Sequence, residues 1–139
     1  MEIDFFKARV KLFTLWGVCF FFILLFFLVQ MIAGRYKGIE NDAWSWFLPN
    51  FIPTISLIAA AFFSDIKKSG EKEQKVNAAY FRFTFYISLG YFIIFSIVLY
   101  SYSRDKGLII AYYRSFSLIF GIIQSLISVS LGAFFIKRK

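Results

Sequence analysis

The sequence predicts an all-α integral membrane protein in which four helices cross the bilayer as one domain, residues 1–139. Of these residues, 60% are hydrophobic and 23% are aromatic, above the roughly 45 to 50% apolar content of soluble domains. A hydrocarbon core of about 30 Å is crossed by about 20 helical residues, and four apolar segments of this sequence are long enough. Helices are expected because open sheets leave edge amides unpaired in lipid, and barrel strands alternate over about 10 residues.

The four predicted spans occupy most of the chain. A polar loop at about residues 65–79 separates the second span from the third. The first apolar run is longer than the core of a signal peptide, and no small-residue cleavage site follows it, so we expect it to be retained. The four spans are predicted at about residues 12–33, 44–64, 80–102 and 108–136.

Two prolines interrupt the second predicted span in the sequence FLPNFIPTIS. Pro53 has no N–H to donate to the carbonyl of Pro49, so the helix should bend or open between them. Asn50 lies between the prolines and can offer its amide to the freed backbone. The break is either a static kink that fits the span to its neighbours or a constriction at the outer mouth of a path through the membrane.

The distribution of Lys and Arg predicts that both termini are cytoplasmic. Eleven of the 16 basic residues fall at the two ends of the chain and in or beside the 65–79 loop, and basic loops stay on the cytoplasmic side. The net charge of +8 is therefore a topology signal with an attraction to anionic lipid, and we expect no direct nucleic-acid binding. The Phe, Ile and Lys bias fits an AT-rich bacterial genome and favours the inner (plasma) membrane.

The residues that enzymes and proton-coupled transporters need are missing from the predicted spans. The chain has no His and a single Cys, Cys19, so a catalytic dyad, a disulfide and a metal cluster all lack parts. No carboxylate lies within the four spans, whereas small multidrug exporters of similar size depend on a glutamate in their first helix. The sequence therefore predicts neither an enzyme nor a bound cofactor or metal.

A stripe of polar and small residues runs along the fourth predicted span. The spacing of three and four residues places the stripe on one helical face, opposite an Ile- and Leu-rich face. Small residues permit close helix packing and polar residues bond between helices, so the stripe either holds helices together or lines a path for water and ions. The stripe consists of Arg114, Ser117, Gly121, Gln124, Ser128 and Gly132.

Gln124 is the stripe residue that most needs an explanation. A buried amide is costly unless it is hydrogen-bonded, and at mid-depth the other spans offer few partners, namely Gln30, Asn50 and Thr54. We therefore expect copies of the fourth span to meet around the axis of a homo-oligomer. Arg114, near the outer end, should either snorkel or pair with Asp42 or Asp105, or else contribute to a ring of positive charge.

Two functions from different classes remain open. The first is an oligomeric channel or membrane-permeabilising effector; small four-helix proteins of this kind occur in bacterial antiviral defence systems and among phage holins, an analogy at the level of fold alone. The second is a non-conducting anchor, scaffold or regulatory subunit that binds a cytosolic partner or gating ligand through the basic loop. The loop residues predicted to contact a partner or lipid are Lys67, Lys68, Lys72 and Lys75.

Overall fold

The computed structural model describes residues 2–66, 75–101 and 106–135, and nearly all of these residues are helical. The all-α prediction is therefore confirmed for this part of the chain, except for one short two-stranded sheet. The elements in chain order are β1 (Glu2–Asp4), α1 (Phe5–Ile32), α2 (Glu40–Phe47), the 3₁₀ helix η1 (Leu48–Asn50), α3 (Ile52–Ile66), β2 (Lys75–Asn77), α4 (Ala78–Tyr100), α5 (Lys106–Ser115) and α6 (Ser117–Phe135).

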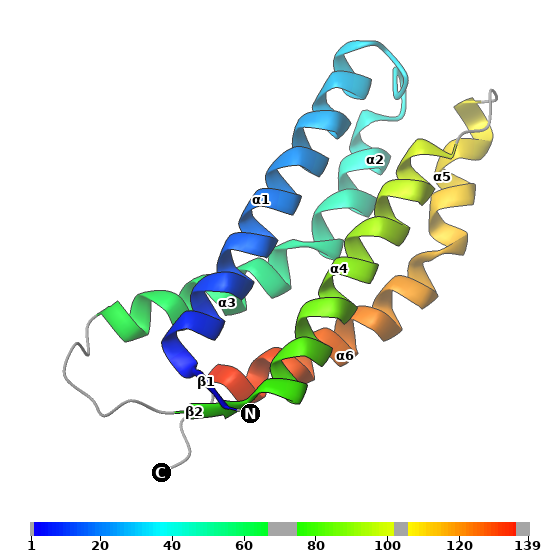
Figure 1. The fold of residues 1–139 in the computed structure, drawn as a ribbon. Coiled ribbons are helices and arrows are strands. Elements are labelled where there is room, and N and C mark those ends of the chain that lie inside the picture. Colours follow the sequence, from blue (N-terminus) through cyan, green and yellow to red (C-terminus); the bar gives the residue numbers. More distant parts are fainter. Residues whose placement is uncertain (1, 67–74, 102–105, 136–139) are drawn as a thin grey trace.

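The helices form a bundle whose two ends differ (Figure 1). The loop between α1 and α2 lies at one end, together with the start of α5. The small sheet and the last turns of α6 lie at the other end. The first strand and the strand within the predicted 65–79 loop are thus at the same end, as the predicted topology requires. Which end faces the cytoplasm stays a prediction from the distribution of charge.

Two helices, α1 and α4, are long and apolar enough to cross a membrane, and a third span is present if α5 and α6 count as one. These last two helices meet at a bend of 41°. The second predicted span is divided among α2, η1 and α3. Because α3 has 15 residues, it reaches only about 22 Å at a rise of about 1.5 Å per residue, short of a core of about 30 Å. The four-span topology therefore stays a prediction.

The first helix begins at Phe5, earlier than the predicted span, because the sequence before Leu12 already has helical spacing. The Asp4 side chain caps this helix by accepting a hydrogen bond from the Phe6 N–H at 3.0 Å. One face of α1 is buried in the bundle, including Leu12 and Trp16. Its opposite face is exposed and apolar over most of its length, as expected of a helix that contacts lipid; this face includes Phe21, Phe22, Val29 and Ile32.

A two-stranded antiparallel sheet, which the sequence did not predict, joins the N-terminus to the chain segment that enters α4. Strand β1 pairs with β2 in the register Ile3 opposite Val76. The Lys75 ammonium lies 3.5 Å from the Glu2 carboxylate. Lys75 is the single predicted contact lysine within the described residues, since Lys67, Lys68 and Lys72 lie outside them. The pairing fixes one end of the 65–79 loop beside the start of α1.

The middle of the bundle is an aromatic core that holds α4 against the helix break and α6. Phe51 and Phe95 contact each other at a ring-centroid distance of 4.6 Å, and Phe95 contacts Phe120 at 5.0 Å. All three side chains are fully buried. These rings fix the position of η1 relative to α6, and this arrangement places the polar stripe of α6 opposite the break.

Candidate functional site

The helix break at the two prolines forms one wall of the candidate site. Helix α2 ends at Phe47, η1 makes one tight turn, and α3 starts at Ile52 in a new direction (Figure 1). Pro53 occupies the first turn of α3, where its missing N–H costs little. The predicted interruption is confirmed, and the chain opens there rather than bending as one continuous helix.

The break frees the backbone carbonyl of Asn50, and side chains from two other helices bond to it. The Tyr91 hydroxyl donates to this oxygen at 2.8 Å, and the Gln124 amide donates to it at 3.1 Å. The Asn50 side chain donates in turn to the Trp46 carbonyl at 2.6 Å, one helical turn earlier in the chain. The irregular backbone is thus satisfied by protein groups, which makes it tolerable at membrane depth.

The expectation that Gln124 lacks a partner in its own chain is wrong. Besides the Asn50 carbonyl, its amide nitrogen donates to the Thr54 hydroxyl at 3.2 Å. Both acceptors come from the broken second span, because the new direction of α3 brings its first turn against α6. The need for a partner from another subunit, which motivated the predicted oligomer, therefore no longer follows from Gln124.

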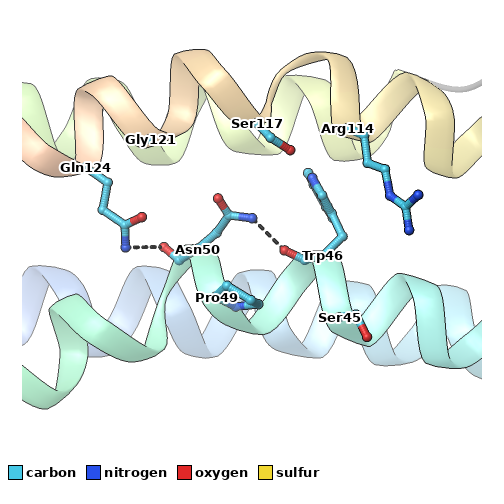
Figure 2. Close-up of a pocket in the computed structure, with 8 residues that line it drawn as sticks. All are labelled: Ser45, Trp46, Pro49, Asn50, Arg114, Ser117, Gly121 and Gln124. Carbon is cyan, nitrogen blue, oxygen red and sulfur yellow. Dashed lines mark hydrogen bonds between the residues drawn. The ribbon is translucent and has the colours of Figure 1, made fainter.

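A pocket of about 380 Å³ lies between the broken span and the helix pair α5–α6 (Figure 2). Arg114 and Ser117 bring hydrogen-bond donors to one end of it. The Asn50 and Gln124 side chains lie toward the other end, where the two are linked through the Asn50 backbone carbonyl. The pocket is lined by Ser45, Trp46, Pro49, Asn50, Arg114, Ser117, Gly121 and Gln124.

Four of the six stripe residues line this pocket, and the structure brings three of them to α6 and one to α5. Ser128 and Gly132 lie further along α6 and are partly exposed. A Cβ atom built at Gly121 or Gly132 would meet no other atom within 4 Å. Close packing within the subunit therefore does not explain these two glycines. The half of the stripe nearer to α5 faces its own chain across the pocket.

Arg114 pairs with Asp42 of α2, and this pair is one of the alternatives predicted for Arg114. The guanidinium lies 3.5 Å from the carboxylate, and the two side chains are 64% and 58% exposed. Such an exposed pair contributes only about 0 to 1 kcal/mol. Little free energy thus holds the Arg114 side chain to Asp42, and its charge stays at the pocket mouth. The other predicted partner, Asp105, lies outside the described residues.

Trp46, which the sequence did not single out as a site residue, lines the pocket. Its side chain is 6% exposed, and its indole Nε1 has no hydrogen-bond acceptor among the residues that the structure describes. The ring is held in place by Tyr113 at 4.4 Å and Phe95 at 5.1 Å between centroids. A sequence signal was available, because Trp46, Asn50 and Pro53 recur at helical spacing.

Hydrogen bonds stabilise the loop that joins α1 to α2 near the pocket mouth. The Tyr36 hydroxyl donates to Gln30 at 2.6 Å and lies 3.0 Å from the Tyr113 hydroxyl. Burial and this second hydroxyl raise the pKa of Tyr36 well above its ordinary value, so the phenol stays neutral. The Glu40 carboxylate accepts from the Gly38 N–H at 2.9 Å, and backbone hydrogen bonds of this kind lower the pKa of Glu40.

The residues around the pocket limit the chemistry of this site, and comparison with known proteins adds nothing to it. Within the described residues, no group of three His, Cys, Asp or Glu side chains could hold a metal ion. The pocket therefore offers neutral hydrogen-bonding groups and one cation. Searches against known protein families, curated proteins and solved structures found no match for this chain.

Proposed function

We propose that this protein forms a homo-oligomeric membrane channel or membrane-permeabilising effector. The pocket at the helix break would be the outer vestibule, and the rest of the stripe would continue the polar path along α6. The main observation that supports this proposal is that four stripe residues line one polar pocket around a break in the second predicted span. Broken helices at membrane depth are tolerated where they line a water-filled cavity.

The open space at the two stripe glycines favours a path for water and ions rather than tight packing between helices. Gly121 is exposed, and a Cβ atom added at Gly121 or Gly132 would not touch a neighbouring helix. A groove that is open on one subunit is closed when symmetric copies meet around an axis. The apolar residues that flank the groove on α6 would then contact neighbouring subunits or lipid; they include Leu118, Ile122, Leu126 and Val129, all exposed.

The proposal includes a location in the bacterial inner membrane with both termini cytoplasmic, and basic residues that contact anionic lipid. A role in antiviral defence rests on analogy at the level of fold. Ion conduction is the part of the proposal that can be tested directly with the purified protein.

The test is ion flux from liposomes that contain the purified protein. Ser128→Val should reduce flux, because it replaces a hydroxyl of the path by two methyl groups, which are apolar and occupy more space. Ser96→Val is the matched control, since Ser96 is exposed on α4 between apolar residues and far from the stripe in sequence. Equal flux in both variants would contradict the assignment of the stripe to the path.

A non-conducting anchor is the second candidate, and two observations favour it. Gln124 is satisfied within its own chain, so the stripe does not require an oligomer. The β1–β2 pairing holds Lys75 in a defined position at one end of the basic loop, where it could contribute to a docking surface for a cytosolic partner. Folded protein that gives no flux for monovalent cations or anions, with or without an applied potential, would favour the anchor over the channel.

A further inference from the structure

The end of the pocket near Arg114 and Ser117 contains an unpaired hydrogen-bond donor. The Trp46 indole N–H is buried without an acceptor among the described residues. Leaving such a group unpaired costs about 1 to 3 kcal/mol. The aromatic contacts that fix the ring also fix the direction of this N–H, and in Figure 2 the indole nitrogen lies between Ser117 and Arg114. The position calls for a ligand atom that accepts a hydrogen bond.

Two further groups define the chemistry of that ligand. The Ser117 hydroxyl, at the start of α6, points toward the indole nitrogen (Figure 2). The Arg114 guanidinium adds a positive charge and several N–H donors at the mouth. Three donors of which one is cationic match an oxyanion, because guanidinium groups bind phosphate and carboxylate oxygens with charge-assisted hydrogen bonds.

We propose that this pocket binds a phosphate-class oxyanion through Trp46 Nε1, Ser117 Oγ and the Arg114 guanidinium. The anion is either the phosphate of a lipid headgroup or a soluble phosphate. A volume of about 380 Å³ lies within the range of about 300 to 1,000 Å³ that is usual for small-molecule sites. The site does not depend on conduction, since a non-conducting anchor would keep the same pocket.

Asp42 is the group that opposes binding. Its carboxylate pairs with Arg114 at 3.5 Å, and an incoming anion must displace it. The pair is largely exposed, so the exchange costs little. The competition predicts that Asp42→Asn raises the affinity for the anion severalfold, because the variant removes both the repulsion and the competing partner.

The experiment follows the indole N–H signals of the protein by NMR in maltoside detergent micelles, which contain no phosphate. With 3 Trp in the chain, the indole region holds three signals, and Trp46→Phe assigns the relevant one while keeping the ring contacts. Sodium phosphate should shift the Trp46 signal saturably, whereas sodium chloride at equal ionic strength should not. In a second arm, phosphatidylglycerol added to the same micelles without free phosphate should shift the Trp46 signal saturably if a lipid headgroup is the ligand.

Variants separate the site from general effects of charge. Arg114→Gln should weaken binding about tenfold, which corresponds to about 1.4 kcal/mol. Lys37→Gln is the charge-matched control in the α1–α2 loop, outside the pocket lining, and should leave binding unchanged. A saturable shift in either arm whose midpoint Arg114→Gln moves about tenfold higher supports the proposal and identifies the source of the anion. The proposal is overturned if neither arm shifts the Trp46 signal, if chloride acts equally, or if Arg114→Gln and Lys37→Gln behave alike.

Discussion

Gly121→Leu distinguishes an open pocket from a tightly packed helix contact. Gly121 lies within α6, where a Cβ atom would meet nothing within 4 Å. A glycine in a helix interior costs about 0.8 to 1.0 kcal/mol relative to Ala, and Leu is nearly as good a helix former as Ala. The Cβ position is open and the pocket of about 380 Å³ has room for the rest of the side chain, so the variant should be more stable by roughly 0.5 to 1 kcal/mol.

The stability gain is measured by thermal unfolding of the purified protein in detergent micelles. For a chain of this size, about 1 kcal/mol shifts the Tm by roughly 3 to 5 °C. Gly17→Leu is the matched control, because Gly17 is an exposed glycine in α1 whose Cβ position is equally open. Both variants should raise the Tm by similar amounts.

Function should separate the two variants. The Leu side chain at position 121 would enter the pocket, so Gly121→Leu should reduce both liposome flux and phosphate binding, while Gly17→Leu should leave both unchanged. A loss of stability of about 1 to 3 kcal/mol in Gly121→Leu alone would indicate overpacking. That result would refute the open pocket and show that the stripe packs against another helix or subunit.

Three further predictions concern the groups around the pocket. Tyr91→Phe should lower stability by about 0.5 to 1.5 kcal/mol, because the Asn50 carbonyl loses one of its two side-chain donors. Gln124→Leu should cost about 1 to 3 kcal/mol, since it also removes the donor to a buried hydroxyl on α3. Stability should fall as the pH drops through the lowered pKa of Glu40, because the carboxylate that accepts from Gly38 then becomes protonated; thermal unfolding across pH 7 to about 3 measures this loss.

Controls for these predictions come from combined and conservative variants. The double variant Tyr91→Phe with Gln124→Leu leaves the Asn50 carbonyl without either donor, so its cost should exceed the sum of the single costs. Strict additivity would mean that the two side chains do not share this acceptor. Glu40→Gln should flatten the acid limb of the pH profile, and an unchanged limb would assign the loss to other carboxylates.

Local sequence signals predicted the break and one of its contacts. Pro53 cannot donate a backbone hydrogen bond whatever its surroundings, so an interruption followed from the residue type alone. The bond from the Asn50 side chain to Trp46 spans only one helical turn, and such a contact depends mainly on spacing along the chain. The start of α1 before Leu12 also has a local sequence signal, because Ile3, Phe6, Val10 and Phe13 recur at helical spacing.

The sequence could not supply the direction in which the chain leaves the break. That direction brings Thr54 to Gln124, and the expectation of a missing partner failed because of it. The β1–β2 pair could not be predicted either, because a strand of three residues is too short to show an alternating pattern that distinguishes it from a loop. The unpaired indole of Trp46 depends on which side chains surround it in space.

Composition and hydropathy by themselves predicted helices that are long and apolar enough to cross a membrane, of which the described residues contain at least two, and the residue types include no His and a single Cys. Both conclusions depend on what lipid and chemistry require of residue types, which needs no knowledge of contacts. The tertiary structure alone decided that the broken span faces the stripe of α6 across a pocket with Arg114 at its mouth. The physical reason is that the pocket joins residues about 70 positions apart, and only the packing of the aromatic core fixes their relative placement.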